Sequence, residues 1–117
     1  MEISENGIED AIQSKGLNAP RLDPPHIDAQ IKAEDYYVFP GTTMTVCALT
    51  LQNGFVVIGE SAAASPENFD QELGRTIARK HARERIWALE GYLLRTQLAA
   101  VAGDPNMPVP GPNQPEL

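Results

Sequence analysis

The chain has 117 residues, enough for one domain, and its content of 42% hydrophobic and 21% charged residues is that of a folded globular protein rather than a disordered one. The net charge of −7 argues against general electrostatic binding to nucleic acid, and the single cysteine, Cys47, excludes an internal disulfide and favours a reducing compartment. The acidic N-terminus lacks the apolar segment of a signal peptide and no apolar run reaches the roughly 20 residues of a membrane span, so we expect a soluble protein of the cytoplasm.

Two short helices are predicted near the N-terminus. Residues 9–15 follow Ile8 with apolar side chains at helical spacing and end at Gly16, a residue suited to a helix C-cap. Asp23 is placed to cap a second helix that runs to Ile31. We assign residues 1–22 to a partly flexible N-terminal segment and residues 23–101 to a single folded domain.

A β-hairpin is predicted in the middle of the chain. Residues 43–51 and 55–59 are rich in β-branched and apolar residues, and the Asn53-Gly54 pair between them is a strong hairpin signal. Residues 36–39 are aromatic and β-branched as well and end at a Pro-Gly turn, so they predict a further strand.

Both faces of this hairpin are apolar, whereas a sheet with one solvated face alternates apolar and polar residues. Cys47 lies on one face and Met44 on the other. We expect the C-terminal helix to cover one face, and the N-terminal helices or a second subunit to cover the other. A homo-oligomer is therefore predicted, with an interface formed by Val46, Ala48, Val56, Ile58 and Tyr92.

A long helix is predicted over residues 66–101, with Ser65 as its cap and Pro66 in its first turn. Its apolar residues recur at helical spacing: Phe69, Leu73, Ile77, Ile86, Leu89 and Leu93. A helix of this length would measure about 50 Å, so either Gly91 marks a break or the end reaches a partner subunit. Residues 102–117 contain five prolines and are expected to be a disordered tail.

The predicted fold class is α+β. Short N-terminal helices precede an antiparallel hairpin, which has three strands if residues 36–39 join it, and one long C-terminal helix packs on it.

Basic residues are concentrated on the long helix. Residues 1–72 carry twelve acidic and three basic side chains, whereas the other six basic residues lie between positions 75 and 95. Arg75, Arg79 and Arg83 recur every fourth residue and share one helix face. This face either is solvated or paired with the acidic N-terminal half, or binds an anionic ligand such as a nucleotide phosphate, with Trp87 near enough to stack on a base. Both interpretations are open.

The sequence contains no residue pattern for catalysis or metal binding. Cys47 lies in the middle of an apolar strand, as a core residue would. The two histidines, His26 and His81, have no partner at metal-ligand spacing. We therefore expect no metal site, no cofactor and no enzyme activity.

Two segments, residues 40–55 (PGTTMTVCALTLQNGF) and 59–62 (GESA), resemble the central signature of a small phage protein family. The resemblance continues through residues 68–70, 74–75, 77–79, 82–83, 86–87 and 91–94. It is the family named for coliphage N-four gene product forty-nine and phage Sf-six gene sixty-six, and the similarity covers roughly residues 16–98. The resemblance implies an accessory protein of tailed phages or prophages in the cytoplasm of an infected bacterium. Small non-catalytic phage proteins there often antagonise host enzymes or defence systems.

Three hypotheses of function result. The first is a phage accessory protein that binds a host protein rather than catalysing a reaction. The second is a sponge that sequesters an anionic nucleotide signalling molecule through Arg75, Arg79 and Arg83. The third is a DNA-linked regulator that uses the basic helix, against which the acidic pI of about 4.7 counts.

Overall fold

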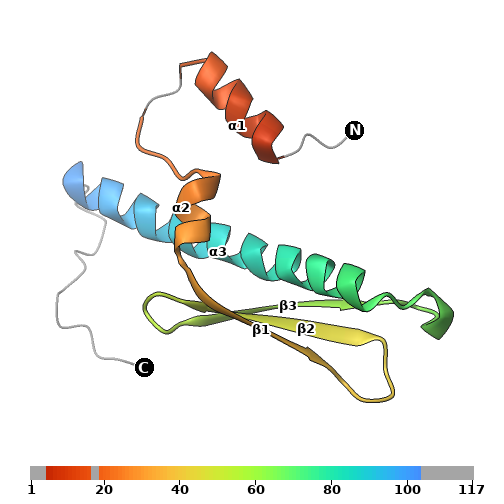
Figure 1. The fold of residues 1–117 in the computed structure, drawn as a ribbon. Helices are drawn as coiled ribbons and strands as arrows, with labels where there is room; N and C mark the ends of the chain where they lie inside the picture. The colour runs from red at the N-terminus through yellow and green to blue at the C-terminus, as the bar shows by residue number, and fades with distance from the viewer. Residues whose placement is uncertain (1–4, 17–18, 104–117) are drawn as a thin grey trace.

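The computed structural model describes residues 5–16 and 19–103 (Figure 1). Residues 104–117 of the predicted tail, and residues 1–4 and 17–18 of the predicted flexible segment, lie outside the described residues. The elements in chain order are α1 (Glu5–Ser14), α2 (Pro24–Ala29), β1 (Ile31–Val38), β2 (Met44–Leu51), β3 (Val56–Ala62), a 3₁₀ turn (Pro66–Asn68) and α3 (Gln71–Val101). This is the predicted α+β fold, with the third strand present. No described helix is long and apolar enough to span a membrane.

Both N-terminal helices form, with shifted ends. α1 starts at Glu5, earlier than predicted, and is followed by Gly16 in the left-handed region at φ +64°. Asp23 caps α2 as predicted, because its Oδ1 accepts a hydrogen bond of 2.9 Å from the backbone N–H of His26. α2 ends at Ala29 rather than Ile31, since Ile31 is taken into β1, where it pairs with Leu51.

The three strands form an antiparallel sheet in the order β1-β2-β3. The predicted strand over residues 36–39 is the second half of a longer β1 that begins at Ile31. The loop between β2 and β3 is closed by a 2.8 Å bond from Leu51 N–H to Phe55 O and a 2.9 Å bond from Gly54 N–H to Leu51 O. Gly54 has φ +89°, so the predicted hairpin forms as a three-residue loop that ends in a left-handed glycine.

α3 packs on one face of the sheet through small side chains. Gly74, Ala78, Ala82 and Ile86 recur every fourth residue and are buried. Of the six larger apolar residues predicted at helical spacing, three are exposed: Leu73, Leu89 and Leu93. Helix and strand come closest at Gly59 of β3, where an added Cβ atom would lie 2.1 Å from Ala78 O and 2.2 Å from Ala82 N. The remaining core residues are Ile27, Cys47, Leu49, Leu51 and Val57, so the prediction that Cys47 is a core residue is confirmed.

The start of α3 differs from the prediction. Residues 66–68 form only a 3₁₀ turn, and Ser65 makes no capping bond, since its hydroxyl donates to the Glu67 carboxylate instead. The helix begins at Gln71 and is capped by Asp70, whose Oδ1 accepts a 2.9 Å bond from Leu73 N–H. It then runs through Gly91 without a break to Val101, the predicted end.

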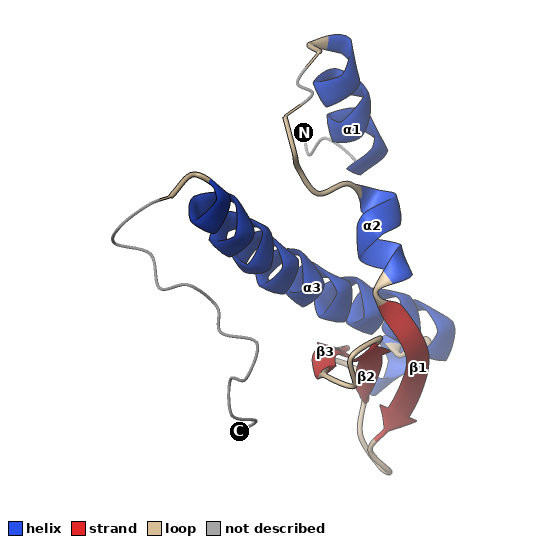
Figure 2. Ribbon diagram, turned by 90° about the vertical axis from the view of Figure 1, so that its left-hand side faces the viewer, coloured by secondary structure: helices blue, strands red, loops and turns tan. Residues whose placement is uncertain are grey.

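The other face of the sheet is uncovered in the described part of the molecule. All three α-helices lie on the α3 side of the sheet (Figures 1 and 2), so the expectation that the N-terminal helices cover the second face is wrong. Paired residues of adjacent strands share a face. The second face, here called the open sheet face, is therefore formed by Asp35, Tyr37, Met44, Val46, Ala48, Thr50, Val56, Ile58 and Glu60.

Candidate functional site

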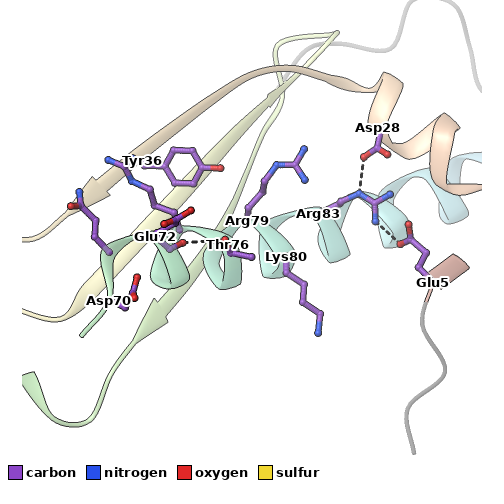
Figure 3. A pocket seen from close by; sticks show the side chains of 11 residues that line it. Glu5, Asp28, Tyr36, Asp70, Glu72, Thr76, Arg79, Lys80 and Arg83 are labelled. Carbon is purple, nitrogen blue, oxygen red and sulfur yellow. Dashed lines mark hydrogen bonds and ion pairs between the residues drawn. The ribbon is translucent and has the colours of Figure 1, made fainter. Parts of the chain in front are cut away.

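Arg75, Arg79 and Arg83 share one face of α3, as predicted. Each follows a buried residue of the sheet-facing stripe by one position, and each contacts β1 or α2: Arg75 reaches Tyr36, Arg79 reaches Glu34 and Arg83 reaches Asp28. Figure 3 shows Arg79 and Arg83 on this flank of α3. They line an open cavity of about 1050 Å³. Four acidic residues and a fourth cation, Lys80, also line this cavity, so it is not a purely basic site.

Arg83 connects the three helices. Its Nε donates a 2.8 Å hydrogen bond to Asp28 Oδ1 at the end of α2, its Nη1 donates to the Glu5 carboxylate at the start of α1, and its Nη2 lies 3.4 Å from Pro24 O. Only 15% of its side chain is exposed. The hydrogen bond to Glu5, together with Asp28, raises the pKa of Arg83, so the guanidinium remains charged.

Arg79 is paired with β1. Its Nε and Nη2 atoms both lie 3.1 Å from Glu34 Oε2, and Tyr36 donates a 2.9 Å hydrogen bond to Glu34 Oε1. The hydrogen bond from Arg79 lowers the pKa of Glu34, while burial is the main cause that raises the pKa of Tyr36. Both oxygens of Glu34 are thus occupied by partners from this chain.

Arg75 and Lys80 have no carboxylate partner among the described residues. The Arg75 guanidinium lies over the ring of Tyr36, 5.5 Å from its centroid, in a cation–π contact. The side chain of Lys80 points away from that of Arg79 (Figure 3), but both line the cavity. An anion that enters the cavity therefore meets Arg75 and Lys80 as its available cations.

Trp87 does not join the arginines. It is half-buried and packs against the core, and it is not among the residues that line the cavity. The aromatic side chain at the cavity is Tyr36, which was not among the predicted site residues. The two-residue period of a strand could have indicated it, because Glu34 and Tyr36 share the face of β1 that points toward α3.

The predicted interface residues fall on two different surfaces. Val46, Ala48, Val56 and Ile58 lie on the open sheet face, where Ala48 pairs with Ile58. Tyr92 lies on α3 and is 77% exposed. It lines a groove of about 580 Å³ along the outer edge of β3, here called the β3 groove, together with Phe55, Val56, Ile58, Arg85, Ala88 and Leu89.

Two aromatic residues of the open sheet face region were missed. Tyr37 is 54% exposed, and its ring meets that of Phe39 edge to face, with 5.0 Å between the centroids. The signal was present in the strand period, since Tyr37 pairs with Val46, which was assigned to this face.

Groups suited to acid–base or nucleophilic chemistry are few in the described ranges. Cys47 is fully buried, and burial raises the pKa of its thiol, which disfavours the nucleophilic thiolate. His81 Nδ1 lies 2.9 Å from the carbonyl oxygen of Glu60, and His26 Nε2 lies 3.7 Å from Glu90 Oε1. No group of three or more His, Cys, Asp or Glu residues within residues 5–16 and 19–103 is arranged to hold a metal ion.

Comparison with known families matches residues 22–98 to the model of a phage protein family. The matched segment begins just before α2 and ends near the end of α3, so it contains the whole sheet, the open sheet face and the β3 groove, while α1 lies outside it. No curated protein and no solved structure matches the chain. The chain belongs to the phage protein (N4 Gp49/phage Sf6 gene 66) family.

Proposed function

We propose that this phage protein acts by binding rather than by catalysis, and that it antagonises a protein of the host cytoplasm through the open sheet face. The observation that supports this proposal is the bare apolar side of the sheet. A contiguous exposed apolar surface of this kind is characteristic of interaction sites.

The chemistry of the open sheet face indicates what partner it fits. Tyr37, Val46, Ala48 and Ile58 form an apolar band across the three strands. Asp35 and Glu60 flank this band at the two sheet edges, and neither carboxylate has an ion-pair partner in the described ranges. The suitable partner carries apolar anchors at the centre of its surface and basic side chains around them.

The test is recovery of a host protein from phage-infected cells by affinity purification with chemical cross-linking. We expect wild type to retain a specific host protein, and Val46→Lys and Tyr37→Ser to lose it while their circular dichroism spectra remain native. Leu93→Ser is the matched control, because Leu93 is a similarly exposed apolar residue on α3, away from the open sheet face. Equal recovery with both open-face variants would contradict the proposal.

A nucleotide sponge is the second candidate, favoured by the size of the arginine-lined cavity and by two cations in it that lack carboxylate partners. Because Arg79 and Arg83 are held by acids, the first phosphate contacts would come from Arg75 and Lys80. Native mass spectrometry with a panel of cyclic nucleotides would then show binding that Arg75→Glu with Lys80→Glu abolishes and Arg95→Glu preserves. If the double variant binds as wild type does, the cavity is not the site.

A further inference from the structure

We propose that the outer edge of β3 pairs with the same edge of a second copy of this chain, which joins the two three-stranded sheets into one continuous sheet. The two α3 helices then lie side by side on one face of that sheet. This inference is independent of the proposed function, because it rests on the outward backbone groups of β3 and on α3, and it shares only Val56 and Ile58 with the open sheet face.

The backbone of β3 is available for such pairing. β3 is bonded to β2 only, and the bond from Leu51 N–H to Phe55 O fixes which residues point toward β2. Along a strand of an antiparallel sheet, the N–H and C=O groups of successive residues point alternately toward one neighbouring strand and away from it. The backbone groups of Phe55 point toward β2, so those of Val56 and Ile58 point to the outer edge. The carbonyl oxygen of Glu60, next in the outward series, lies 2.9 Å from His81 Nδ1, which agrees with this alternation.

The surroundings of this edge suit an added strand. The β3 groove runs beside it and is lined by Phe55, Ala88, Leu89 and Tyr92. In a symmetric pair the helix-facing residues of the added strand, Val57 and Gly59, stay covered by their own α3, so the groove receives the α3 helix of the second copy rather than side chains of its strand. The opposite edge is less suitable, because β1 carries a register irregularity between Ile31 and Ala33 and charged residues along its length.

Charge complementarity between two copies of the chain points to a second copy as the occupant of this edge. The direction of α3 relative to β3 determines which charged residues of the two copies meet. Val56 lies beside Tyr92 in the β3 groove, whereas Glu60 contacts His81, so α3 runs antiparallel to β3. A two-fold axis near Ile58 makes the paired strands antiparallel, and it also makes the adjacent helices antiparallel, with Arg85 near their crossing.

At this crossing Arg85 of each copy faces Glu84 of the other. Both side chains are exposed, and neither makes an ion pair in the described part of a single chain. The pair is therefore self-complementary under two-fold symmetry. Ala88, one turn along the helix, leaves space for the second helix to approach.

The open sheet face is a poorer place for the second copy. Packing two such faces together would bury Asp35 and Glu60 of both copies, and no residue assigned to that face is a cation. Uncompensated buried carboxylates oppose association strongly. Edge pairing avoids this cost and leaves both open sheet faces free, side by side on the same surface of the dimer.

The test is the mass of the full chain by sedimentation equilibrium over a wide range of concentrations. Wild type is expected to form a dimer of twice 12.7 kDa. Glu84→Arg or Arg85→Glu alone should weaken the dimer about tenfold, since two-fold symmetry turns one change into two repulsive contacts. The double swap, Glu84→Arg with Arg85→Glu, should restore wild-type affinity.

A second variant tests the strand edge itself. Ile58→Pro removes an outward N–H and leaves the bonds to β2 intact, so it should give a monomer with a native circular dichroism spectrum. Lys32→Glu, on β1 at the opposite edge of the sheet, is the control and should leave the dimer unchanged. A wild type that stays monomeric throughout, or a dimer that none of the Glu84 and Arg85 variants weakens, would overturn the proposal.

Discussion

Gly59 sets the distance between the sheet and the long helix. A Cβ atom at this position would overlap the backbone of α3 at Ala78 and Ala82, and the backbone cannot move aside as a flexible side chain could. The two alanines are therefore matched to the glycine, and together they bring the helix axis close to β3.

Substitution of Gly59 by alanine is expected to lower the free energy of unfolding by about 3 kcal/mol, because the helix must move off the sheet. Urea denaturation measures this change. Gly91→Ala is the matched comparison, since the nearest atom to its added Cβ is a leucine side-chain carbon 3.9 Å away. That variant should be as stable as wild type or up to about 1 kcal/mol more stable, as helix propensity predicts.

Glu34 gives the stability a pH dependence whose sign is defined. Its pKa is lowered in the folded protein from the ordinary value of 4.5, mainly by the hydrogen bond from Arg79. The stabilisation is therefore fully present above that ordinary value and is lost as the pH falls through the lower folded-state pKa. Thermal unfolding from pH 7 to pH 3 should show a smaller loss of Tm for Glu34→Gln than for wild type; parallel curves would contradict this.

At the scale of elements, α1 is attached to the rest of the molecule by charge. None of its residues is buried, and Arg83 links its first residue to α2 and α3. Arg83→Ala should therefore release α1. We expect faster hydrogen exchange over residues 5–14, with α3 and the sheet unchanged. Arg79→Ala is the control, because Arg79 contacts β1 and not α1. Unchanged protection of α1 in Arg83→Ala would show that other contacts hold it.

The sequence predicted the elements well where local signals and burial agree. The Asn53-Gly54 hairpin, the Asp23 cap and the end of α3 at Val101 are confirmed. The first half of β1 was missed because it is an exposed edge whose charged residues resemble those of a loop. The start of α3 was misplaced because Ser65 and Pro66 suit a 3₁₀ turn as well as an α-helix.

The shared helix face of Arg75, Arg79 and Arg83 could be predicted from the sequence, but the residues that pair with them could not. The four-residue spacing of the arginines was sufficient to place them on one face. Their partners could not be read from the sequence, since Glu34 lies 45 positions from Arg79 and Glu5 lies 78 positions from Arg83. The helix residues on the sheet were also misjudged, because hydrophobic periodicity favours leucines and the contact with Gly59 requires small side chains.

At the scale of the whole molecule, α3 separates two flanks. The arginine-lined cavity lies on the side of β1, the β3 groove lies on the side of β3, and the open sheet face is the face of the sheet away from α3. The proposed dimer contact and the proposed host-binding face share only Val56 and Ile58, so variants of Glu84 and Arg85 on one surface and of Tyr37 and Val46 on the other can separate them.

This separation predicts an avidity effect. The dimer-weakening variant Glu84→Arg should bind the host protein with wild-type affinity when that protein is free in solution. On a sensor surface densely coated with the same protein it should dissociate faster than wild type, because a dimer presents two open sheet faces. Equal dissociation of wild type and variant at every coating density would contradict the prediction.

The order of the elements along the chain also determines when contacts form during synthesis. The sheet and α3 are consecutive, so the core assembles from neighbouring segments as they leave the ribosome. α1 is made first, yet Arg83 must be synthesised and α3 must be in place before Glu5 has its partner. Although α1 precedes the other described helices in the chain, it is therefore among the last of them to dock.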